Sequence, residues 1–189
     1  MTVSRITRRH LLGATGIALA APSIVAAELN PVPPLNRHNM MGFTTQRWQD
    51  HFDTLGKATI VADTTSRALH FWSGDGQFYK VYPTSVPRTD ELTRRGYTSV
   101  VREKVGPTWT PTANMRANDP TLPPFMEAGE GNPLGTHAMY LGWPAYLIHG
   151  THDTRKIGRR SSSGCIGLYN DKIAELFAIT PIGTQVKLI

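Results

Sequence analysis

The chain has 189 residues, of which 40% are hydrophobic and 18% charged, with a formal net charge of +6. This length suits one domain with a substantial hydrophobic core, and the apolar content excludes a disordered chain. No apolar run is long enough to indicate a membrane-spanning protein. Three of the arginines lie in the first 27 residues, so residues 28–189 carry only +3. Without a clustered basic stripe, we expect no nucleic-acid partner.

The first 27 residues have the three-part layout of a secretory signal. The pair Arg8-Arg9 precedes a modest apolar stretch, and small residues end the segment at Ala27. The string TRRHLL resembles a twin-arginine signal, which exports proteins that are already folded. We therefore predict a periplasmic protein with an export signal over 1–27 and no membrane span once the signal is removed. An uncleaved anchor and an amphipathic N-terminal helix are the alternatives.

Residues 28–56 are predicted to be a linker followed by a short helix. Prolines and polar residues dominate the first part of the segment. Trp48, Phe52 and Leu55 then recur at the spacing of one helical face, which predicts a helix over Thr45–Leu55 that packs on the core.

From residue 57 onward, short apolar or alternating runs are separated by turn residues, a pattern typical of antiparallel strands. The stretch Gly106–Pro133 is rich in proline and is predicted to be a long irregular loop. Asn170 is expected to cap a helix over Asp171–Ala178. The fold class is therefore mainly β, a sandwich or barrel with one or two short helices. The predicted strands are Ala58–Ala62, Ala68–Trp72, Phe78–Tyr82, Tyr97–Lys104, His137–Leu141, Tyr146–His149 and Thr184–Ile189.

Cys165 is the only cysteine, so the chain has no internal disulfide. A single cysteine in an exported protein indicates an intermolecular bridge or a thiol kept for its reactivity. We expect the N–H groups of Gly164 and Cys165 to stabilise an oxyanion. We expect His149 to take the thiol proton, with the carbonyl of Gly150 or a serine hydroxyl orienting its ring. The thiolate should then form well below the pH at which a free thiol ionises.

Two structural interpretations stay open, namely an inert buried thiol at Cys165 and a purely structural role for His149. A metal site built from His149, His152 and Asp153, with His137 as a further ligand, matches neither a helical i, i+4 pair nor standard zinc spacing. We therefore expect no metal and no organic cofactor.

The run IHGTHDTRKIGRRSSSGCIGLYN resembles the signature of the L,D-transpeptidase catalytic domain, also called the YkuD-like family. The blocks PTWTPT at 107–112, LPPF at 122–125 and GNPLGTHAMYL at 131–141 extend the resemblance, which covers roughly residues 57–189. It implies a β-rich catalytic domain that attacks the carbonyl between positions three and four of a peptidoglycan stem tetrapeptide. The thiol forms a thioester, terminal D-alanine leaves, and an amine of another stem or water takes the acyl group.

The resemblance implies that Cys165 is the nucleophile and His149 the base, with Gly164 and Ser162 matching the glycine and serine of the family's S-H-G-C block. Ser163 stands where the family usually has histidine, and this residue and Gly150 are expected to support the site.

The second departure from the family pattern is Gly167, which stands where an arginine is common. A guanidinium there would bind a substrate carboxylate, and its loss leaves that anchor to be supplied elsewhere. The candidate substrate-binding residues are Arg159, Arg160, Trp109 and Tyr140.

The sequence thus predicts an exported cysteine L,D-transpeptidase that acts on peptidoglycan stem peptides. A peptidoglycan hydrolase (carboxypeptidase, endopeptidase or amidase) with the same Cys-His chemistry is the alternative, and an inactive wall-binding homologue is a third interpretation. Another stem peptide, a lipoprotein lysine, a D-amino acid and water stay open as acyl acceptors.

Overall fold

The computed structural model describes residues 44–189. The predicted export signal and most of the predicted linker fall in residues 1–43, outside the described residues. Among residues 44–189, no helix is long and apolar enough to cross a membrane.

Three consecutive strands form one end of the main sheet. β1 (Ala58–Asp63), β2 (Ala68–Ser73) and β3 (Tyr79–Pro83) pair antiparallel in chain order, as their alternating runs predict. The Asp63 carboxylate accepts two backbone N–H groups of the β1–β2 turn at 2.8 and 3.0 Å, which is why an aspartate begins this turn.

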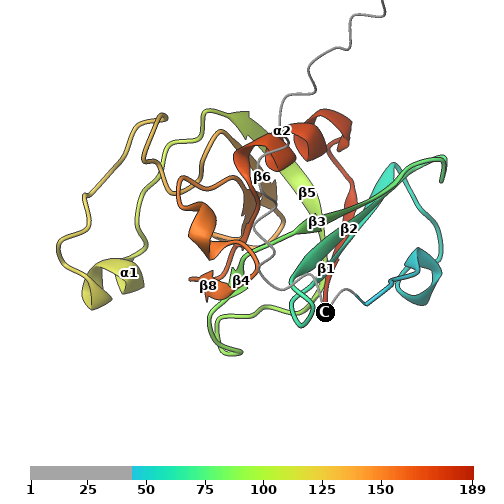
Figure 1. The fold of residues 1–189 in the computed structure, drawn as a ribbon, viewed down its shortest axis with the longest axis horizontal. Coiled ribbons are helices and arrows are strands. Elements are labelled where there is room, and N and C mark those ends of the chain that lie inside the picture. Colours follow the sequence, from blue (N-terminus) through green and yellow to red (C-terminus); the bar gives the residue numbers. More distant parts are fainter. Residues whose placement is uncertain (1–43) are drawn as a thin grey trace, which may run out of the picture. The chain divides into compact units, whose positions relative to one another are not determined.

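The main sheet has eight strands in the order β3-β2-β1-β10-β5-β6-β7-β9 and curls into a half-barrel (Figure 1). The last strand, β10 (Gln185–Leu188), lies between β1, to which it is parallel, and β5 (Gly96–Val105), to which it is antiparallel. This mainly β architecture confirms the predicted fold class. The remaining elements are η2 (Trp48–Asp50), β4 (Val86–Pro87), α1 (Ala113–Asn118), β6 (His137–Leu141), β7 (Leu147–His149), η3 (Thr154–Lys156), β8 (Arg160–Ser162), β9 (Ile166–Gly167) and α2 (Asn170–Ile179), with β4 and β8 pairing in a separate parallel sheet.

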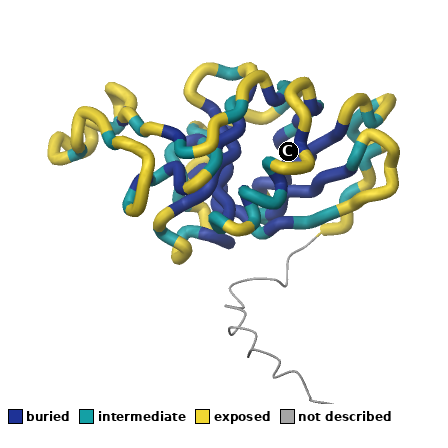
Figure 2. Tube along the Cα trace, turned by 90° about the horizontal axis from the view of Figure 1, so that it is seen from above, coloured by how far each residue is buried: buried dark blue, intermediate teal, exposed yellow. Residues whose placement is uncertain are grey.

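The hydrophobic core is formed by side chains from one face of the main sheet and from the inner face of α2. Ile173 and Leu176 are fully buried and Phe177 packs at the edge of the core, so the predicted apolar face of this helix is confirmed. A smaller apolar cluster lies on the opposite face of β6 and β7. Figure 2 shows the buried strands and the largely exposed segment that projects from them.

The prediction of a helix over Thr45–Leu55 is wrong. Only one 3₁₀ turn, η2, forms there, and none of its residues is buried. The Tyr97 hydroxyl and the Gln185 amide each donate to a backbone carbonyl of this segment, both at 2.8 Å. These bonds tie the segment to the sheet, and tertiary contact overrides the helical spacing of its apolar residues.

The projecting segment Gly106–Pro133 is more ordered than predicted. It contains α1, whose first turn is capped by the Thr112 hydroxyl. Trp109 and Met126 exchange two backbone hydrogen bonds at 2.8 and 2.9 Å, which join the two arms of this projecting loop. The prolines therefore exclude long regular elements but not this short helix.

Candidate active site

The two residues predicted to carry the chemistry meet at the edge of the main sheet. β7 and β9 run parallel with His149 opposite Gly167. Because successive side chains of a strand alternate between faces, Ile148 and Ile166 enter the core while His149 and Cys165 share the opposite face. The structure therefore brings the imidazole and the thiol to one side of two adjoining strands.

The His149 ring is oriented by its neighbour. The side chain is 9% exposed, and its Nδ1 hydrogen-bonds to the carbonyl of Gly150. A carbonyl oxygen only accepts, so Nδ1 carries the proton and Nε2 keeps its lone pair. From the sequence, either the Gly150 carbonyl or a serine hydroxyl is expected to orient the His149 ring, and in the structure the partner of Nδ1 is the Gly150 carbonyl. Burial lowers the pKa of His149 to about 4, so the imidazole is neutral at pH 7 and its free nitrogen is a proton acceptor.

Gly150 is packed against Asn170, a residue whose role the sequence did not reveal. Asn170 is the first residue of α2 rather than its cap, since the capping position falls on Tyr169, which makes no side-chain cap bond. Its Oδ1 instead accepts the backbone N–H of Thr136 at 3.2 Å and would lie 2.3 Å from a Cβ placed on Gly150. The amide thus fills the space behind the carbonyl that orients His149.

The Cys165 thiol is neutral in the resting protein. The side chain is half-buried, and its Sγ–H donates to the carbonyl of Ala145 at 3.7 Å. Burial raises the pKa of Cys165 to about 11, against a weaker opposing effect from a backbone hydrogen bond of Leu147. The direction is opposite to the lowered pKa expected from the sequence. A neutral imidazole creates no field to hold a thiolate, and desolvation penalises the anion.

The turn before the cysteine is built by Ser162. Its hydroxyl donates to the Cys165 carbonyl at 2.6 Å and accepts the Gly164 N–H at 3.3 Å. Gly164 has φ +141°, which favours glycine at this point. Because its N–H is already bonded, only the Cys165 N–H remains of the two oxyanion donors expected from the sequence. Ser163, the other expected support residue, accepts a hydrogen bond from the Arg88 guanidinium.

The two aromatic residues predicted to bind substrate lie on the same apolar cluster as the thiol. Trp109 and Tyr140 pack with Cys165 around the smaller apolar cluster. The projecting loop that carries Trp109 is held in place by Asn132, a buried residue that the sequence does not single out. The Asn132 side-chain amide donates to the carbonyls of Pro107 and Glu127 at 3.0 and 2.9 Å.

The two arginines predicted to bind substrate are not brought to the thiol by any side-chain contact in the described chain. Arg160 directs its guanidinium to the Asp90 carboxylate at 2.7 Å and to the Pro87 carbonyl at 3.3 Å. Arg159 is exposed and bonds only through its backbone within residues 44–189.

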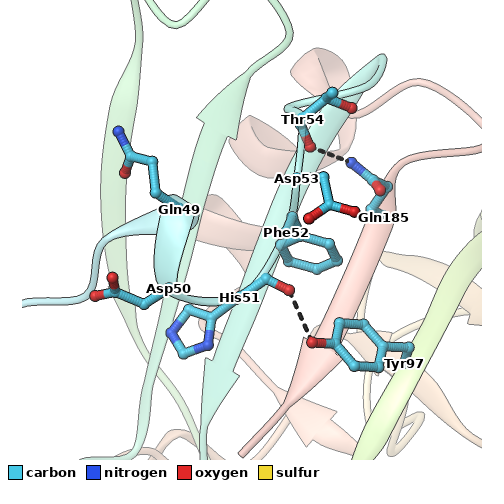
Figure 3. Close-up of a pocket in the computed structure, with 8 residues that line it drawn as sticks. All are labelled: Gln49, Asp50, His51, Phe52, Asp53, Thr54, Tyr97 and Gln185. Carbon is cyan, nitrogen blue, oxygen red and sulfur yellow. Dashed lines mark hydrogen bonds between the residues drawn. The ribbon is translucent and has the colours of Figure 1, made fainter.

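Residues 44–189 contain no group of three or more His, Cys, Asp or Glu side chains that could hold a metal ion. A pocket of about 510 Å³ is lined by residues 49–54, Tyr97 and Gln185, whose side chains are drawn in Figure 3. None of these residues belongs to β6, β7 or β9, so this pocket is distinct from the face that carries Cys165.

Comparison with known proteins identifies the family. The model of the YkuD family, the L,D-transpeptidase catalytic domain, matches residues 57–188. A protein of Fuscovulum blasticum, whose name places it among the L,D-transpeptidases, is 57% identical over 179 residues, covering 95% of this chain and 93% of its own length. The Escherichia coli relative ErfK/SrfK is 39% identical over 72% of this chain, and the match spans 45% of that relative.

Solved structures agree on the fold. An L,D-transpeptidase from Mycobacterium smegmatis superimposes with a TM-score of 0.55 at 19% identity, covering 70% of this chain and 58% of that one. L,D-transpeptidase 3 from Mycobacterium tuberculosis gives 0.54 at 17% identity, with 70% and 61% coverage. Together with the match of the family model over 57–188, these findings show that the chain belongs to the L,D-transpeptidase (YkuD) catalytic-domain family.

Proposed function

We propose that this protein is a cysteine L,D-transpeptidase that transfers peptidoglycan stem peptides through a thioester on Cys165, with His149 as the base. The observation that carries the proposal is the shared face of β7 and β9, which places the His149 imidazole and the Cys165 thiol on one side of two adjoining strands. Family membership supports the reaction type, and the residue roles are derived from this chain.

In the first step the thiol attacks the peptide carbonyl between residues three and four of the stem. A sulfur–carbon bond forms, the carbonyl oxygen gains the electron pair, and the thiol proton passes to Nε2 of His149. The Cys165 N–H is the backbone donor available to the oxyanion. Because both groups are neutral at rest, the proton moves during the attack rather than before it.

In the second step the carbon–nitrogen bond breaks. The imidazolium returns its proton to the departing amine, which leaves as D-alanine, and the thioester remains on Cys165. The same nitrogen then takes a proton from the incoming amine as that amine attacks the thioester, and the thiol is restored. Water in place of the amine gives hydrolysis with the same proton transfers.

The experiment is incubation of the protein with stem tetrapeptide, with and without an amine acceptor, followed by intact-protein and product mass analysis. A transpeptidase gives an adduct on Cys165 and a peptide joined to the acceptor. A free tripeptide in both arms indicates the hydrolase, and no adduct in either arm indicates a wall-binding homologue. Cys165→Ala is the control and should form no adduct.

We also propose that the protein acts outside the cytoplasmic membrane, in the periplasm, because its substrate is there and because of the twin-arginine-like segment at 1–27. Fusion of residues 1–27 to a folded reporter tests this point. Export that is lost when Arg8 and Arg9 are both changed to Lys supports the twin-arginine route, and export of the double variant contradicts it.

A further inference from the structure

At position 167, where the family commonly has arginine, the space for a side chain is taken by the hydroxyl of Ser85. A Cβ placed on Gly167 would lie 2.4 Å from Ser85 Oγ, closer than real Cβ atoms come to other atoms. The two residues also exchange backbone hydrogen bonds at 2.8 and 3.1 Å, which hold the Ser85 backbone beside Gly167. The Ser85 hydroxyl therefore occupies the space that a side chain at 167 would need and would have to rotate away to admit one. Because residue 167 is a glycine, an anion anchor must come from another segment.

The segment that supplies Ser85 also supplies a guanidinium. Through β4 it reaches Arg88, whose side chain bonds to the Ser163 hydroxyl and, at 3.5 Å, to the Ser162 carbonyl. The Arg88 backbone N–H adds a 3.0 Å bond to the same carbonyl. Ser163 is two residues before Cys165, so these bonds hold the guanidinium beside the turn that carries the nucleophile.

The positive charge of Arg88 is not neutralised by an acidic side chain of residues 44–189. Its two side-chain bonds go to neutral oxygens, and it forms no ion pair with any acid of residues 44–189. A guanidinium has five N–H donors, so some remain for a carboxylate. Arg160, by contrast, is bonded to the Asp90 carboxylate. The guanidinium of Arg102 lies over the Tyr140 ring at 3.4 Å, so one of its faces is already in contact with an aromatic side chain.

We propose that Arg88 binds the carboxylate of the residue that leaves when the donor peptide acylates Cys165. In a stem tetrapeptide this carboxylate lies one residue beyond the attacked carbonyl, about 4 Å along the chain, which matches the place of Arg88 beside the turn. The inference rests on the proposed function for the identity of the donor, but the anion site beside the thiol is a separate property. Because Arg88 is exposed, its attraction is screened by salt.

The first test uses two alkylating agents that differ in charge. Iodoacetate carries a carboxylate and iodoacetamide does not, so the ratio of their rates with Cys165 reports a nearby cation. We expect Arg88→Gln to lower this ratio about fivefold at low salt and Arg88→Lys to keep most of it, with the difference vanishing near 1 M salt. Arg155→Gln, which changes an exposed arginine in η3, is the charge-matched control and should leave the ratio unchanged.

The second test compares a tetrapeptide donor with the same peptide amidated at its C-terminus. Arg88→Gln should raise KM for the free carboxylate about tenfold and leave KM for the amide unaltered, with Arg88→Lys in between. An unchanged alkylation ratio in Arg88→Gln, or a ratio that falls instead in Arg159→Gln or Arg160→Gln, overturns the inference. A lowered ratio without turnover of either peptide leaves the anion site standing and overturns the proposed function.

Discussion

The two ends of the main sheet each bury a histidine, and the pair shows what makes one of them a candidate catalyst. His70 on β2 is 1% exposed, and His149 on β7 is 9% exposed. Burial lowers the pKa of both side chains. Burial and a perturbed pKa therefore do not distinguish a catalytic imidazole from a structural one.

The difference lies in the groups around each ring. His70 bonds through Nδ1 to the Tyr79 hydroxyl at 2.8 Å and stacks with Trp72 and Tyr79, and its Nε2 is buried without a partner. His149 bonds to a backbone carbonyl and lies on the same face of adjoining strands as the thiol of Cys165. An imidazole becomes a useful base where its free nitrogen meets a group with a proton to give, and only the β7 end offers one.

Turnover should separate the two histidines most strongly. His149→Gln should lower the rate of peptide transfer by about 10²–10⁴, the usual effect of losing a general base. His70→Gln should stay within about threefold once the folded fraction is taken into account. Steady-state transfer with both purified variants measures this, and equal losses in the two would contradict the assignment of the base.

The reactivity of the thiol tests the resting state at the β7 end. With the pKa of Cys165 raised to about 11, the thiolate fraction grows tenfold for each unit of pH below that value. Iodoacetamide labelling should therefore rise about 100-fold between pH 7 and pH 9 and stay slower than labelling of free cysteine, whose pKa is about 8.5. A plateau already reached near pH 7 would indicate a thiolate–imidazolium pair instead.

Acid stability probes both ends of the sheet. The pKa of His149 is about 4 when folded against 6.5 when unfolded, so between these values the unfolded chain binds more protons. Stability is then full above pH 6.5 and is lost as pH falls toward 4, by about 3 kcal/mol from this residue. Urea unfolding at the two pH values should show this loss reduced in His149→Gln and in His70→Gln, but not in His152→Gln, which changes an exposed ring. An undiminished loss in His149→Gln would mean that its ring is not buried neutral.

The smallest effect concerns packing beside the site. Gly167→Ala should destabilise the fold by about 1–3 kcal/mol, because the new methyl group would lie 2.4 Å from Ser85 Oγ. Combining it with Ser85→Gly should recover most of the loss, which a double-mutant cycle by urea unfolding measures. Additive effects of the two changes would show that this contact does not decide the residue at 167.

The sequence predicts the elements whose signal is local. β1, β2 and β6 follow from alternating or apolar runs within a few residues, and the apolar face of α2 follows from its helical spacing. The prediction of a helix over Thr45–Leu55 is wrong because the deciding contacts are not local. The spacing of its apolar residues favours a helix, but hydrogen bonds from side chains of β5 and β10 determine the path of the segment.

In the candidate site too, the sequence predicts the residues with a local signal and not those defined by contacts distant in the chain. Cys165 and His149 are recognisable from residue type, context and family resemblance. Arg88 and Asn132 are not, because each acts on a partner distant in sequence, 75 residues away for Arg88 and Ser163 and 25 for Asn132 and Pro107. The raised pKa of the thiol does not follow from the sequence either, because it depends on the burial produced by the whole fold.

The central claim is that His149 removes the proton of Cys165 as this thiol attacks a peptide carbonyl. Rapid-quench acylation by a stem tetrapeptide, with the modified residue located by mass spectrometry, tests it most directly. The account predicts a thioester on Cys165 in the parent protein and acylation at least about 100-fold slower in His149→Gln at neutral pH. An adduct on another residue, or equal acylation rates in the two proteins, would contradict it.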